Sequence, residues 1–131
     1  MKNEAKSVVS AFLTAIQNGD NEKLATLLHP SVTWSQPGEN QISGIKKSNA
    51  EVFQMVGKMF ELSANTLRLT DITMIGANGN KASCVLRWTA SQPNGNTMEV
   101  DNIDVYTVEN GQIVQAEIFS ADLEKENEFW A

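Results

Sequence analysis

The chain has little of several residue types on which protein chemistry often depends. Its 131 residues include one cysteine and one histidine, so an internal disulfide is excluded. A single cysteine is typical of a reducing compartment. One cysteine and one histidine are too few for a catalytic zinc site and make a Cys–His nucleophile improbable, and no glycine-rich nucleotide-binding motif is present. We therefore expect neither a metal nor a cofactor.

Positive charge is also scarce, because 10 Lys and Arg face 16 Asp and Glu, for a net charge of −6. Nucleic acids and anionic membranes both require clustered basic residues, so we expect neither as a partner. No apolar run is long enough to span a membrane, and the first twenty residues lack signal-peptide organisation. With 41% hydrophobic residues, the sequence predicts one cytoplasmic globular domain over residues 1–131.

The first part of the chain has the periodicity of amphipathic helices. Apolar residues follow helical spacing from Ala5 to Ile16, and Gly19 suits a left-handed helix end. Asp20 is a candidate N-cap for a second helix, which we expect to include Leu28 and to end at Pro30.

A third helix and a series of strands follow. Ser48 and Glu51 form a capping box that opens a helix with an apolar stripe over residues 52–60. From Asn65 on, the period is two, and Asn78-Gly79 and Asn110-Gly111 are strong hairpin turns. A change of parity predicts a bulge near Thr70 and Asp71. The expected strands are Ser31–Gln36, Leu67–Ile75, Lys81–Gln92, Thr97–Val108 and Gln112–Ser120.

This order of elements predicts an α+β domain. Helices come first and a long antiparallel meander follows, so the helices should cover one face of a curved sheet. The space between a curved sheet and its helices is where small molecules usually bind. The last residues, 121–131, form a short helix or a tail that docks through Phe129 and Trp130.

Two segments resemble a known family. The segment "AFLTAIQNGDNEKLATLLHPSVTWSQPGENQISG" resembles the opening of the nuclear transport factor 2-like superfamily, and "IDVYTVENGQIVQAEIFSADL" resembles its closing hairpin. The SnoaL-like branch, which shares the ketosteroid isomerase and polyketide cyclase fold, is most similar. The resemblance implies a cone-shaped domain, in which N-terminal helices pack on a strongly curved, mostly antiparallel sheet that encloses a pocket.

The ketosteroid isomerase pattern is only partly present. That pattern needs an Asp base, a Tyr donor and a second Asp that stays protonated in an apolar site. Here Phe12 stands in place of the Tyr, Gln36 stands in place of the base, and only Asp104 matches. Because a glutamine cannot abstract a proton, we do not expect isomerisation by this route.

The resemblance and the strand parity together suggest the residues that line the pocket. If Asp104 points inward, Asn102 and Tyr106 do so too. Asp104 and Asp122 are the candidate catalytic acids, since a SnoaL-like cyclase places an acid on the last strand. The pKa of Asp104 depends on whether burial or a nearby Arg87 dominates, and the sequence leaves this open. The candidate ligand-binding residues are Phe12, Trp34, Gln36, Phe53, Val85, Arg87, Asn102, Tyr106, Ile118 and Ser120.

Three functions remain open from the sequence. The first is a protein that binds a small, largely apolar molecule with one polar end, Trp34 forming a flat wall. The second is an enzyme that performs acid–base chemistry on a carbonyl or epoxide substrate. The third is an adaptor whose pocket is vestigial. If the inward and outward faces of the strand Thr97–Val108 are exchanged, Asp104 faces solvent. We expect a homodimer through the outer sheet face, where Trp88, Ile103 and Phe119 would lie.

Overall fold

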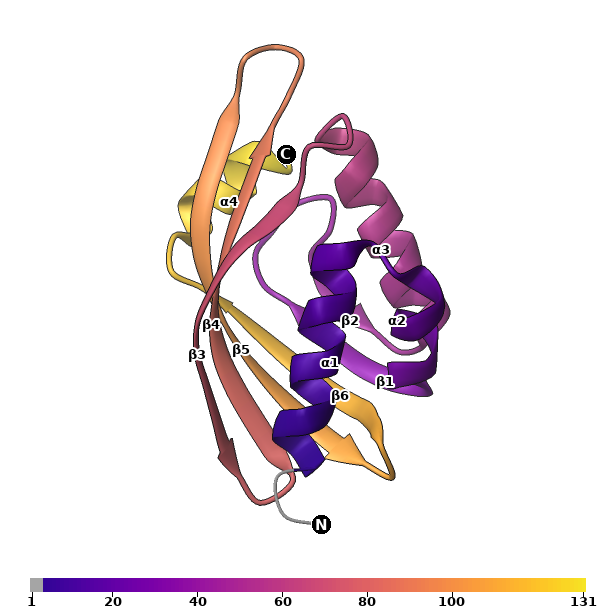
Figure 1. Ribbon diagram of the computed structural model, residues 1–131. Helices are drawn as coiled ribbons and strands as arrows, with labels where there is room; N and C mark the ends of the chain where they lie inside the picture. The colour runs from indigo at the N-terminus through magenta and orange to yellow at the C-terminus, as the bar shows by residue number, and fades with distance from the viewer. Residues whose placement is uncertain (1–3) are drawn as a thin grey trace.

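The computed structural model describes residues 4–131, except for the side chains of Met74 and Ile75. Residues 1–3 of the expected domain lie outside the described part. Helices and strands follow one another in the order that Figure 1 shows. They are α1 (Glu4–Asn18), α2 (Asn21–Leu27), β1 (Leu28–Gln36), β2 (Gly44–Lys46), α3 (Asn49–Leu62), β3 (Arg68–Asn78), β4 (Lys81–Ser91), β5 (Thr97–Glu109), β6 (Gln112–Ser120) and α4 (Leu123–Phe129).

The six strands form one curled sheet in the order β2-β1-β6-β5-β4-β3. Neighbours pair antiparallel, except that β1 and β6 run parallel. Helices α1, α2 and α3 lie on one side of the long strands, while α4 lies near the end of β4 and the start of β5 (Figure 1). The expected α+β fold, with helices on a strongly curved and mostly antiparallel sheet, is therefore confirmed.

α1 ends at the glycine that the sequence predicts, and α2 and α3 begin at their predicted capping residues. Gly19 follows α1 with a φ of 67°, a left-handed conformation that glycine adopts at little cost. The side chain of Asp20 accepts a hydrogen bond from the N–H of Lys23, and that of Ser48 accepts one from the N–H of Glu51. The apolar side of α1 is buried, with Val9 and Leu13 fully covered. This helix therefore fixes one wall of the interior.

The boundary after α2 differs from the expectation. The helix ends at Leu27, and Leu28 is already extended at the start of β1. Pro30 lies within the strand instead of ending a helix. Because proline cannot donate a ladder hydrogen bond, it is tolerated where pairing is irregular. The register of β1 against β6 does shift between Leu28 and Thr33.

The bulge and the Asn110-Gly111 turn agree with the sequence, whereas the first hairpin turns one residue later than predicted, at Gly79 and Asn80, because Asn78 still pairs with Lys81. Asn110 and Gly111 both have positive φ, 50° and 77°, and Gly79 has a φ of 61°. Such angles match the right-handed twist of the strands that the turns connect. The pairing of β3 with β4 shifts register between Leu69 and Asp71, where the bulge was expected.

The predicted orientation of β4 is wrong. Cys84 lies opposite Asp104 and Leu86 lies opposite Asn102, so these residues share a face. Val85 and Arg87 therefore point to the outer face, and Trp88 points inward. The register of Ser91 opposite Thr97 fixes this arrangement. A shift of the register by one residue turns every side chain of a strand to the other face. The sequence of the loop between β4 and β5 does not specify this register.

The outer sheet face carries large apolar side chains. Ile103 is 47% exposed and Phe119 is 52% exposed, on neighbouring strands directly opposite each other. The expected homodimer through this face stays a prediction. No helix in the described part of the chain has the length and apolar character that crossing a membrane requires.

Candidate functional site

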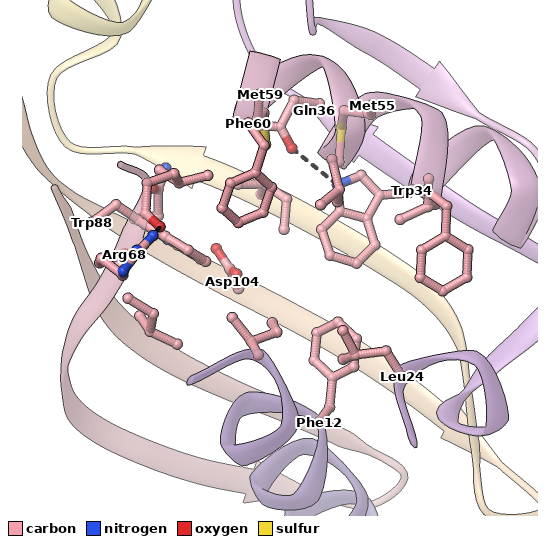
Figure 2. A pocket seen from close by; sticks show the side chains of 18 of the residues that line it. Phe12, Leu24, Trp34, Gln36, Met55, Met59, Phe60, Arg68, Trp88 and Asp104 are labelled. Atoms are coloured by element: carbon pink, nitrogen blue, oxygen red, sulfur yellow. Dashed lines mark hydrogen bonds between the residues drawn. The ribbon is translucent and has the colours of Figure 1, made fainter. Parts of the chain in front are cut away.

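A cavity of about 510 Å³ lies between the helices and the concave side of the sheet. Most of its lining is apolar, and the lining residues come from all four helices and from every strand except β2 (Figure 2). Eight of the residues expected at the pocket line this cavity. They are Phe12, Trp34, Gln36, Phe53, Asn102, Asp104, Tyr106 and Ile118.

Three aromatic rings form one wall of the cavity. The ring centroids of Phe12 and Tyr106 are 5.7 Å apart at an edge-on angle, and those of Trp34 and Tyr106 are 6.0 Å apart. The third pair, Phe12 and Trp34, is 6.2 Å apart. Tilted and edge-on contacts of this kind stabilise aromatic clusters. Phe12, which stands in place of the tyrosine of the ketosteroid isomerase pattern, is thus a packing residue here.

Gln36 holds the indole of Trp34 in place. Both residues have the same parity on β1, and the indole Nε1–H donates a hydrogen bond of 2.9 Å to Oε1 of Gln36 (Figure 2). This pair is buried, with Trp34 8% exposed and Gln36 7% exposed. The amide therefore fixes the orientation of the flat wall.

Asp104 is the polar group in the middle of the cavity. Figure 2 shows its side chain in the open centre of the view, below the ring of Phe60. The hydroxyl of Tyr106, two residues along β5, donates a hydrogen bond of 2.6 Å to Oδ2 of Asp104. Oδ1 of Asp104 is buried and has no hydrogen-bond partner among residues 4–131. One carboxyl oxygen is thus held by the protein and the other is unpaired.

Burial decides the protonation of this carboxyl. Removal from water, together with a smaller effect of the nearby Glu126, raises the pKa of Asp104 to about 7, although the hydrogen bond from Tyr106 opposes the rise. Burial also raises the pKa of Tyr106 well above its ordinary value, so its hydroxyl stays protonated as a donor. Asp104 therefore changes charge near neutral pH.

Arg87 does not take part in the cavity, contrary to the sequence-based expectation. Its Nε donates to Oδ1 of Asp101 at 2.9 Å, on the outer face of the sheet. Asp101 is the residue directly opposite it on β5. The guanidinium that would have lowered the pKa of Asp104 is therefore on the other side of the sheet.

Three further expected residues lie outside the cavity. Val85 shares the outward parity of Arg87. Asp122 is exposed, and its side chain caps α4 by accepting a hydrogen bond from the N–H of Lys125 at 3.0 Å. Oγ of Ser120 accepts one from the N–H of Asp122 at 3.2 Å. The chain turns into α4 directly after β6, so the inward parity of that strand does not continue to Asp122.

Much of the lining was not predicted as a site. α3 contributes a row of apolar side chains, whose helical stripe is visible in the sequence. The inward parity of β4 adds Trp88. The C-terminal segment adds Glu126 and Trp130, which are 5% and 1% exposed. The two aromatic residues near the C-terminus were the only sequence signal for this contribution.

The mouth of the cavity is marked by its exposed lining residues. These lie at the end of α1 and at the start of β3, where Nη1 of Arg68 donates to the carbonyls of Asn65 and Leu67. Nε2 of Gln17 donates to the carbonyl of Leu69 at 3.4 Å, and this hydrogen bond connects the end of α1 with the start of β3. Arg68 is the basic residue among the described lining, so positive charge is confined to the mouth.

Comparisons with known proteins agree with this architecture. A Xanthomonas campestris protein of unknown function with a cystatin-like fold is 34% identical, with a TM-score of 0.92 over 97% of this chain and 98% of that chain. TerC, co-crystallised with polyporic acid, is 15% identical, with a TM-score of 0.83 over 98% of this chain and 99% of that chain.

A protein from Jannaschia sp. CCS1 that is described by its likeness to SnoaL-like polyketide cyclases is 16% identical, with a TM-score of 0.78 over 98% of this chain and 93% of that chain. No curated protein sequence matches the chain. The model of the SnoaL-like domain matches residues 9–116. The chain therefore belongs to the SnoaL-like family, within the nuclear transport factor 2-like superfamily.

Proposed function

We propose that the cavity binds a small, largely apolar molecule whose one polar end lies at Asp104. The observation that carries this proposal is a half-paired, buried carboxyl inside an aromatic cavity of about 510 Å³. Ligand pockets typically have this size and this combination of apolar walls with few polar groups. The co-crystallisation of a protein of the same fold, TerC, with polyporic acid agrees with small-molecule binding. The cytoplasm stays the expected location.

The aromatic wall should be needed for binding. In a thermal-shift panel of steroids, flat phenols, lactones, enones and fatty acids, at least one class should stabilise the protein. A ligand at a hundred times its Kd adds about 2.7 kcal/mol, which raises Tm by roughly 5 to 10 °C. Trp34→Ala should reduce this shift, because it removes the wall.

The matched control is Phe119→Ala, an aromatic truncation on the outer face, which should leave the shift intact. If Trp34→Ala and Phe119→Ala keep the same ligand shift, Trp34 is not part of the binding site. If no compound class stabilises the wild type, the proposal itself fails.

A second candidate function is acid–base catalysis on a carbonyl or epoxide substrate. It is favoured by the pKa of Asp104, about 7, since proton transfer is most efficient when the pKa of the catalytic group is near the working pH. A panel compound that binds should then exchange its acidic C–H protons with D₂O, followed by NMR. Asp104→Asn should lower this rate by roughly 10²- to 10⁴-fold. An unchanged rate in Asp104→Asn would remove Asp104 from the chemistry.

A further inference from the structure

The C-terminal segment closes one end of the cavity, although it lies outside the part of the chain that the family model matches. That match ends at residue 116, whereas α4 spans Leu123–Phe129. The carbonyl of Trp130 accepts a hydrogen bond of 3.2 Å from the N–H of Gln41, and that of Phe129 accepts one of 3.0 Å from Nε2 of Gln92. The segment is thus held by the loop between β1 and β2 and by the loop between β4 and β5.

This segment also carries polar groups to the cavity. Oε2 of Glu126 accepts a hydrogen bond of 3.1 Å from Nδ2 of Asn102, which lies two residues before Asp104 on β5. Trp130 follows one helical turn later, and its ring meets that of Phe129 edge-on at 4.8 Å. Both Glu126 and Trp130 line the cavity. The sheet and α4 therefore contribute to one polar region.

Two buried side-chain atoms lack a hydrogen-bond partner within the described part of the protein. They are Oδ1 of Asp104 and Nε1 of Trp130, and both residues line the same cavity. A buried polar atom left unpaired costs roughly 1 to 3 kcal/mol, so native proteins rarely retain one without a use. The indole N–H only donates, and above about pH 7 the carboxyl of Asp104 is ionised and only accepts. The two atoms have complementary requirements.

We propose that Trp130 is a specificity-determining residue, and that the polar end of the ligand is hydroxylated. A hydroxylated end can accept a hydrogen bond from the indole N–H and donate one to the carboxylate of Asp104, through one hydroxyl or through two, so it meets both requirements. An apolar end meets neither, and an ether oxygen meets only that of the indole. This inference rests on the proposed function, because it names the polar group of the molecule that the cavity binds.

The test compares two probes of nearly equal shape, 4-hydroxybiphenyl and 4-methylbiphenyl, by titration calorimetry at about pH 8.5, where Asp104 is ionised. The wild type should bind the hydroxyl probe more tightly. Trp130→Phe keeps an aromatic ring but removes the N–H, so it should weaken binding of the hydroxyl probe roughly tenfold. Binding of the methyl probe should stay unchanged, which also shows that the variant is folded.

A second measurement uses the wild type alone. In a ¹⁵N-labelled sample, the Nε1–H resonance of Trp130 should move downfield with the hydroxyl probe and stay in place with the methyl probe. The resonance is one of three indole signals, which single Trp→Phe variants assign.

The possible results separate the two proposals. Equal binding of the two probes by the wild type, or equal weakening of both by Trp130→Phe, would overturn the role of Trp130 and leave the apolar cavity as the binding site. An unmoved indole resonance at saturation with the hydroxyl probe would overturn it as well. Failure of the wild type to bind either probe would contradict the proposed function, and this inference with it.

Discussion

Trp130→Ala is expected to lower the free energy of unfolding by roughly 3 to 5 kcal/mol, as truncations of a buried tryptophan do. The side chain is 1% exposed and is the largest of the fully buried residues. Its loss removes the contact with Phe129 and leaves an empty space at the end of the cavity. Urea denaturation followed by circular dichroism measures the effect, provided that the slope of the transition is unchanged.

Ile45→Ala is the control for this prediction. Ile45 is 60% exposed on the edge strand β2 and is not among the residues expected at the dimer interface, so its truncation should change the free energy of unfolding by no more than about 0.5 kcal/mol. A loss below about 1 kcal/mol for Trp130→Ala would mean that the C-terminal segment is not an integral part of the domain.

Asp104→Asn is expected to remove a pH dependence of stability. Burial raises the pKa of Asp104 to about 7 from its ordinary value of 3.8. Between these two values the folded protein binds a proton that the unfolded chain has lost. The stability of the wild type therefore falls as pH rises through this interval and levels off above the folded pKa. Asparagine resembles the protonated acid and does not titrate.

The difference in unfolding free energy between the wild type and Asp104→Asn should thus change by about 3 kcal/mol between about pH 5 and about pH 8.5, in favour of the variant at high pH. Asp101→Asn is the control. The pKa of Asp101 is lowered by its hydrogen bond with Arg87, so it is ionised in both states over this range and the difference should stay flat. A flat difference for Asp104→Asn as well would mean that its carboxyl is ionised in the folded protein.

Most helix ends and the Asn110-Gly111 turn could be predicted from the sequence because each depends on local chemistry. Ser48 caps α3 and Gly19 ends α1 through contacts within a few residues. The alternation of β5 likewise places Asn102, Asp104 and Tyr106 on one face without reference to other strands. The polar centre of the cavity was therefore within reach of sequence analysis.

The errors concern features that depend on distant parts of the chain. The orientation of Arg87 depends on how β4 pairs with β5, and a shift of one residue reverses it. The burial of Glu126 depends on where α4 docks, and a single glutamate in a short acidic helix gives no sign of it. The choice between a raised and a lowered pKa for Asp104 depended on both of these placements.

The most direct test of this account is the pKa of Asp104 in the folded protein. The side-chain carboxyl carbon, followed by ¹³C NMR across the pH range and assigned with Asp104→Asn, should titrate with a midpoint near 7. That result would place a carboxyl that is half-ionised near neutral pH inside the aromatic cavity. A midpoint near 4, the value of a solvated aspartate, would contradict the burial of Asp104 and with it the proposed polar end of the site.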